Sequence, residues 1–368
     1  MSAGKLFSPF TLGGLALPNR IVMAPMTRCR AAGPATAPTP MMAEYYGLRA
    51  EAGLILSEGA VVSPQARGYA YTPGLYSAEQ VAGWQAVTRE VHRRGGRIFA
   101  QLWHCGRASH GSVREDNAPP VGPGAIAAKA RALALDRATG ETAWQPCEPP
   151  RALSTAEVKG VVGEFAQAAK NAIAAGFDGV EIHGANGYLL DQFRCPIVND
   201  RTDVYGGPLE NRCRLHLEVA REVAAAVGPG RAGIRLSPLG QANDLQPDPE
   251  PMATYGYLAE ELQKLGLAYL HLYDQSTSWI HDPSNELLQL IRAKFTNALI
   301  LCGGFDGARA EAALAAGSGD LVAIGKPFIS NPDLVGRLRR GAELAPYDSK
   351  TFYTGGRDGY LDYPGLSA

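Results

Sequence analysis

The sequence predicts an α/β protein whose parallel strands close into a (β/α)8 TIM barrel, and three observations predict this fold. Eight short aliphatic and β-branched runs alternate with longer segments of helical periodicity, which is typical of parallel βαβ units. The alternation continues along the chain of 368 residues without a break. No strand carries a GxGxxG motif, which disfavours an open, doubly wound sheet. We therefore expect residues 1–368 to form a single barrel domain.

The elements follow in chain order. The opening sequence FSPFTLGGLALPNR predicts an N-terminal hairpin that plugs the barrel floor. The eight strands are predicted at 20–26, 54–62, 97–104, 179–184, 232–238, 269–274, 298–304 and 321–326. Helices are predicted at 79–94, 154–175, 209–227, 251–265 and 306–316, and Ser154 with Glu157 predicts a capping box. The stretch 105–150 is rich in Pro, Gly and Ala, so we expect a long excursion after the third strand, over the barrel mouth.

Composition narrows the classes of function. The formal net charge is −1 and no basic stripe with interleaved aromatics occurs, so we expect a small-molecule partner and neither nucleic acid nor a membrane. The six cysteines show no CxxC or other metal-ligand spacing, which predicts reduced thiols in a cytoplasmic compartment. No apolar run reaches the roughly 18 residues of a membrane span.

In barrels of this kind the carboxyl ends of the strands surround the active site. Three kinds of group lie at these ends: polar or aromatic side chains, two cations and several glycines. They are Thr27, Gly59, Gln101, Trp103, His183, Arg235, Gly303, Gly304 and Lys326. Each also has a structural reading, such as a helix cap for Thr27, a satisfied core amide for Gln101 and close packing for Gly59. Converging on one mouth, they favour a polar, planar ligand.

Two of these groups indicate negative charge on the ligand. Gly303-Gly304 before a helix, with Gly325-Lys326 at the next strand end, fits the phosphate cradle that barrels often build there. The alternative is that the glycines only turn the chain. Arg235 ends an apolar strand and needs an anionic or electron-rich partner, with a structural salt bridge as the alternative.

The segment EIHGANGYLLDQF, at 181–193, carries the reactive groups. The short spacer after the strand can bring the His183 imidazole and the Asn186 amide side by side, as two donors for a carbonyl or nitro oxygen. Tyr188 is a candidate proton donor and a poor general base at neutral pH. A structural His183, a core aromatic Tyr188, and a weak zinc site built from His183 and His104 are the alternatives.

The chain resembles the Old Yellow Enzyme family of FMN-dependent ene-reductases, in the group of pentaerythritol tetranitrate reductase, N-ethylmaleimide reductase and morphinone reductase. The motifs that carry the resemblance are LFSPFTLGGLALPNRIVMAPMTR, PTPMMAEYYGLRA, SEGAVVSPQARGY, QLWHCGR, EIHGANGYLLDQF, RTDVYGGPLENR, GIRLSP, ISNPDL and FYTGGRDGYLDYP.

The resemblance implies an NADPH dehydrogenase or ene-reductase that holds FMN non-covalently and takes NADPH or NADH as a transient reductant. Residues around the flavin ring would be Pro25, Met26, Thr27, Gly59, Gln101 and Arg235. Those at its phosphate would be Gly303, Gly304, Phe305, Gly325 and Lys326. His183 and Asn186 would bind the substrate oxygen, Tyr188 would protonate the α-carbon, and Tyr69, Trp103 and Tyr353 would line the substrate side.

The substrates that the resemblance implies are activated alkenes, with nitro compounds or nitrate esters as further candidates. The implied assembly is a monomer or a homodimer. Lys326 stands where relatives usually carry arginine, which removes a bidentate phosphate contact. Two other functions remain open at this point: a flavin-free lyase or isomerase acting on a phosphorylated substrate, and a slowly turning redox sensor. Iron–sulfur barrel dehydrogenases lack support because the cysteines are not clustered.

Overall fold

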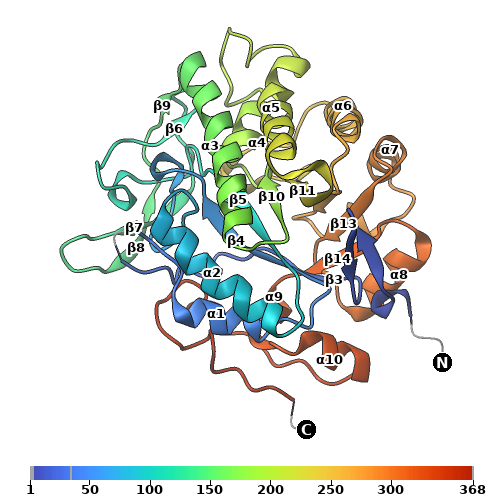
Figure 1. The fold of residues 1–368 in the computed structure, drawn as a ribbon. Helices are drawn as coiled ribbons and strands as arrows, with labels where there is room; N and C mark the ends of the chain where they lie inside the picture. The colour runs from blue at the N-terminus through green and yellow to red at the C-terminus, as the bar shows by residue number, and fades with distance from the viewer. Residues whose placement is uncertain (1–3, 34, 367–368) are drawn as a thin grey trace.

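The computed structural model describes residues 4–33 and 35–366, and its centre is a closed barrel of parallel strands (Figure 1). The strand order around the barrel is β10-β11-β12-β13-β14-β3-β4-β5. The strands are β3 Ile21–Met23, β4 Leu54–Val61, β5 Ile98–Trp103, β10 Gly179–His183, β11 Ala232–Leu236, β12 Tyr269–Tyr273, β13 Ala298–Cys302 and β14 Leu321–Ile324. The predicted fold class is confirmed, and each of these strands lies within its predicted range.

Helices surround the barrel. They are α1 Pro40–Gly47, α2 Ala78–Arg93, α3 Thr155–Ala174, α4 Leu189–Arg194, α5 Leu209–Val227, α6 Pro251–Lys264, α7 Glu286–Lys294, α8 Gly307–Ala316, α9 Lys326–Ser330 and α10 Leu334–Arg340. The predicted capping box is present: Glu157 N donates to Ser154 Oγ at 3.2 Å and Ser154 N donates to Glu157 Oε2 at 2.7 Å. α3 then buries a stripe that includes Val158, Val161 and Phe165.

The N-terminal hairpin closes the barrel floor, as predicted. It consists of β1 Phe10–Leu12 and β2 Leu15–Leu17, which pair antiparallel. Leu12 and Leu17 are buried in one cluster with the inner residues of the barrel strands. At the tip, Gly13 has a φ of +55° and approaches the Gly230 carbonyl so closely that a Cβ would lie 1.9 Å from the oxygen. Only glycine fits this contact.

The excursion after β5 contains regular strands that the sequence did not predict. β7 Arg131–Leu135 and β8 Thr142–Pro146 form an antiparallel hairpin, and the short β6 Val121–Gly122 pairs in parallel with β9 Arg151–Ala152. Trp144 of β8 packs against Tyr69 and Tyr353, so the excursion reaches the barrel mouth as expected. Among the described residues, no helix is long and apolar enough to cross a membrane.

Candidate active site

A small cavity lies at the barrel mouth and brings together five of the predicted site residues. Its volume is about 110 Å³, and it is lined by Thr27, Cys29, Tyr69, Trp103, Trp144, Tyr188 and Tyr353. The sequence interpretation missed Trp144 as a lining residue and gave Cys29 no role. Trp144 lies on a strand whose residues are all exposed, so no hydrophobic pattern distinguished it from an ordinary surface residue.

The wall of the cavity is aromatic. The rings of Tyr69 and Trp103 stack with centroids 5.6 Å apart, and the rings of Trp103 and Tyr188 lie nearly perpendicular with centroids 4.9 Å apart. Gly59 makes room for this indole, because a Cβ there would lie 2.5 Å from Trp103 Cε3. Gly59 is therefore a position where the backbone packs closely against a large side chain, which was the structural alternative for this residue.

The turn after β10 is held in shape by a second loop. Asn186 and Gly187 have φ values of +58° and +73°, a conformation that asparagine and glycine tolerate best. Asn186 N donates to Ser237 Oγ at 2.8 Å, and Asn243 Nδ2 donates to Asn186 O at 2.8 Å. These contacts span more than fifty residues, so the sequence alone gave no sign of Ser237 or Asn243.

In the part of the chain that the structure describes, the polar ends of His183 and Asn186 have no hydrogen-bond partner. His183 Nδ1 and Asn186 Oδ1 are buried without a hydrogen bond, and no described residue bonds to His183 Nε2 or Asn186 Nδ2. Burial lowers the pKa of His183 well below its ordinary value, and Arg235 and His271 lower it further. The imidazole is therefore neutral at physiological pH, with one N–H available to a ligand.

Tyr188 lies beside the imidazole, with 5.0 Å between the two ring centroids. Its hydroxyl is 3.3 Å from the Tyr69 hydroxyl. Burial raises the pKa of Tyr188 above its ordinary value. The phenol therefore keeps its proton at physiological pH and can act as a donor.

Arg235 and Gln101 lie deeper in the barrel. Arg235 forms no ion pair with any described carboxylate; its Nη2 donates to Cys302 Sγ at 3.5 Å and its Cζ lies 4.7 Å from the centre of the Tyr273 ring. Arg235 Nε is buried without a partner. Gln101 Nε2 donates to Glu181 Oε1 at 2.8 Å. The structural salt bridge considered for Arg235 is thus absent from the described residues, and the guanidinium keeps capacity for an anionic ligand.

The ends of β13 and β14 present backbone donors. Gly303 and Gly304 have φ values of +155° and +65°, and the N–H groups of Gly304, Phe305 and Gly325 bond to no described residue. Lys326 beside them is exposed. A Cβ at Gly325 would lie 3.6 Å from Met26 Sδ, so this cradle adjoins the segment Pro25-Met26-Thr27 after β3. The residues present fit a planar, anionic group with a phosphate.

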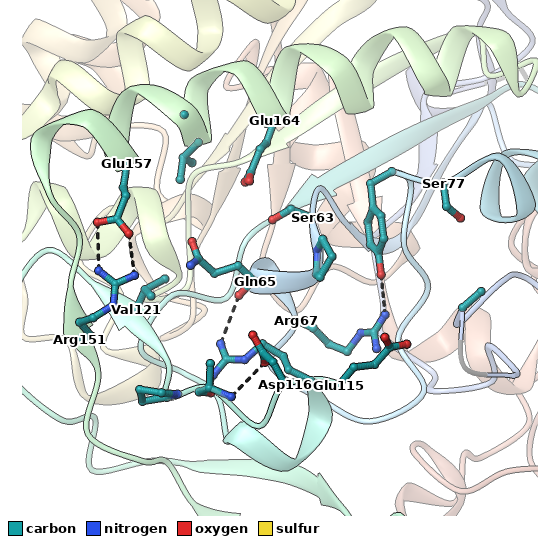
Figure 2. Close-up of a pocket in the computed structure, with 18 of the residues that line it drawn as sticks. Ser63, Gln65, Arg67, Ser77, Glu115, Asp116, Val121, Arg151, Glu157 and Glu164 are labelled. Atoms are coloured by element: carbon teal, nitrogen blue, oxygen red, sulfur yellow. Dashed lines mark hydrogen bonds and ion pairs between the residues drawn. The ribbon is translucent and has the colours of Figure 1, made fainter.

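A larger cavity, of about 710 Å³, lies outside the mouth (Figure 2). α3, the loop of 63–67 and the segment of 114–121 surround it, and Arg151 pairs with Glu157 at 2.7 Å on its rim. None of the predicted site residues lines it. In the described part of the chain, no group of three or more His, Cys, Asp or Glu residues could hold a metal ion.

Comparison with known proteins agrees with this geometry. Residues 5–345 match the model of the NADH:flavin oxidoreductase / NADH oxidase family. The chain belongs to this family. It is 43% identical to 12-oxophytodienoate reductase 7 of Oryza sativa subsp. japonica, over 98% of this chain and 94% of the relative. It is 40% identical to a probable flavin mononucleotide-dependent alkene reductase of Leishmania infantum, over 99% of this chain and 98% of the relative.

Solved structures agree as well. A structure of morphinone reductase superposes with a TM-score of 0.93 at 47% identity, covering 99% of this chain and 97% of that one. Another, of morphinone reductase in complex with tetrahydroNAD, gives a TM-score of 0.94 at 46% identity, covering 99% and 98%. The protein is an FMN-dependent ene-reductase of the Old Yellow Enzyme type, as the sequence predicted. The lyase and redox-sensor alternatives are set aside.

Proposed function

We propose that an activated alkene binds with its electron-withdrawing oxygen between His183 and Asn186 and receives its proton from Tyr188. The observation that carries this proposal is the set of free polar atoms on His183 and Asn186, buried beside a protonated phenol. Buried polar groups are almost always hydrogen-bonded, so free ones at the mouth of a barrel call for a ligand.

The two donors act on the charge that develops during the reaction. Attack on the β-carbon of an enone moves electron density to the carbonyl oxygen, and two neutral N–H donors in a site with little water stabilise it there. Because the His183 imidazole is neutral and the Asn186 amide does not titrate, neither donor loses its proton near neutral pH. Tyr188 then completes the reduction by releasing its proton to the α-carbon.

We place the cofactor along the strand ends. Pro25, Met26, Thr27, Gly59, Gln101 and Arg235 would contact its ring system. Gly303, Gly304, Phe305, Gly325 and Lys326 would contact its phosphate. Bound FMN supplies the hydride, which it receives from NADPH or NADH. Arg235 is suited to hold negative charge on the ring, because it has no carboxylate partner within the described residues.

The substrate class follows from the cavity walls. Tyr69, Trp103 and Tyr353 would hold a flat, conjugated molecule, such as an α,β-unsaturated carbonyl or nitro compound, with nitrate esters as a further class. We also propose that residues 1–368 act as one FMN-binding domain, as a monomer or homodimer without nucleic acid or membrane partners. The six cysteines are buried and free of disulfides, which supports a reducing compartment such as the cytoplasm.

The substitution Tyr188→Phe tests the proposal. We expect oxidation of the reduced flavin by 2-cyclohexenone to slow by about 10²–10⁴-fold, while reduction of the flavin by NADPH stays within a few-fold of the wild type. Stopped-flow absorbance measures the two half-reactions separately. Tyr71→Phe is a matched control, because its hydroxyl bonds to the Gly140 carbonyl outside the cavity. Equal slowing of both half-reactions would contradict the proton-donor role.

A further inference from the structure

A network of charged and polar side chains crosses the barrel interior beneath the mouth. The Glu181 carboxylate accepts from Gln101 Nε2 through Oε1 and from His271 Nδ1 through Oε2, both at 2.8 Å. Glu181 and His271 are completely buried. Arg235 stands in register with His271 on the next strand and bonds to Cys302. Two groups proposed to face the flavin, Gln101 and Arg235, therefore belong to one buried cluster.

The charge states of Glu181 and His271 determine which hydrogen bonds they can make. Burial raises the pKa of Glu181, but His271, Arg235 and Gln101 together outweigh this effect, and the pKa is lowered overall. Burial and Arg235 oppose the charge on His271, but Glu181 and Cys302 together outweigh them, so the pKa of His271 is raised. Glu181 is thus an ionised carboxylate, which accepts hydrogen bonds and donates none.

We infer that Glu181 is a positioning residue that fixes the orientation of the Gln101 amide. An amide can rotate by half a turn and exchange its oxygen and nitrogen at little steric cost. Because the Glu181 carboxylate is ionised, only the –NH₂ end of Gln101 can point toward it. The carbonyl oxygen and the second N–H of Gln101 therefore point away from Glu181 and are available to a ligand. The inference rests on the proposed placement of Gln101 at the flavin ring.

The burial of the pair supports a role beyond stability. Removing two charges from water costs about as much as their attraction returns, so buried ion pairs are poor stabilisers compared with apolar packing. Glu181 also lies in a strand whose other residues are Gly, Val, Ile and His183, in the interior of a barrel where apolar side chains normally fill the layers. The Glu181 carboxylate, which accepts one hydrogen bond from Gln101 and one from His271, instead fixes the orientation of the Gln101 amide.

A double-mutant cycle on FMN affinity tests the inference. The variants are Glu181→Gln, Gln101→Ala and both together, and the measurement is fluorescence titration of each apoprotein with FMN. Gln101→Ala should weaken FMN binding by about tenfold. Glu181→Gln should weaken it by a comparable factor, because a neutral amide at 181 can pair with either end of Gln101. In the double variant, the loss should stay within about twofold of that in Gln101→Ala.

Non-additivity is the expected result, since a positioning residue has no effect once the group it positions is gone. Penalties that multiply in the double variant would overturn the inference, because a structural role for Glu181 does not depend on Gln101. An unchanged FMN affinity in Gln101→Ala would overturn the placement of Gln101 as well. Thermal unfolding of each apoprotein verifies folding. If Glu181→Gln does not fold, Glu181→Asp, which keeps the charge and withdraws the carboxylate by one methylene, replaces it in the cycle.

Discussion

Replacement of Asn186 separates two properties of this residue: the amide that we propose binds the substrate oxygen, and a backbone in the left-handed conformation. Asn186→Ala and Asn186→Gly both remove one of the two proposed donors, so each should slow hydride transfer to an enone by about 10²-fold. The two variants differ in the backbone. At a φ of +58°, alanine carries a penalty of about 1 kcal/mol that glycine does not.

Stopped-flow reoxidation by 2-cyclohexenone and urea unfolding measure the two properties independently. We expect the variants to be equally slow, and Asn186→Ala to unfold more easily than Asn186→Gly. If Asn186→Gly reacted at the wild-type rate while Asn186→Ala did not, the backbone geometry of the turn, and not the amide, would be the functional property. That result would refute the two-donor account of substrate binding.

Three further predictions concern other parts of the chain. Burial raises the pKa of Glu58 from 4.5 to about 7. Between these pH values the folded protein keeps a proton on Glu58 that the unfolded chain releases, so the free energy of unfolding should fall as the pH rises from 4.5 to 7. In urea unfolding, the free energy of unfolding of Glu58→Gln should fall less over this pH range than that of the wild type, by up to about 3 kcal/mol, and an equal fall in both proteins would contradict the prediction. Lys326→Arg should lower the Kd for FMN by restoring a bidentate phosphate contact; equal flavin retention on dilution would count against this. Trp144→Ala should raise kcat/KM for a bulky 3-substituted enone by about tenfold relative to 2-cyclohexenone, and a common factor for both substrates would contradict a steric role.

The barrel could be predicted because its strands are short apolar runs bounded by turn residues. The predicted strands at 179–184 and 298–304 are one and two residues longer than β10 and β13, because they include Gly184 and the pair Gly303-Gly304, which turn the chain after the strands end. The turn that carries the proposed catalytic residues was singled out in the sequence because His183, Asn186 and Tyr188 follow directly on a strand end. Of the three, only Tyr188 lines the mouth cavity, and its neighbours there come from distant segments that periodicity alone does not bring together.

Other parts of the site depend on contacts between distant segments. Ser237 and Asn243 shape the Asn186 turn through single hydrogen bonds, and Trp144 reaches the mouth from an exposed hairpin, so none of the three has a local signature. Glu181 and His271 did have one: each is a charged or titratable residue in the middle of an apolar strand. Such residues need buried partners, and here the two residues are each other's partners across distant strands, which the sequence of neither strand shows.

The most direct test of the whole account is one anaerobic absorbance titration of the purified protein. We expect a flavin spectrum that bleaches when NADPH is added and returns when 2-cyclohexenone follows, with FMN recovered after denaturation. A colourless protein that takes up no FMN, or a bleached flavin that the enone does not reoxidise, would contradict it.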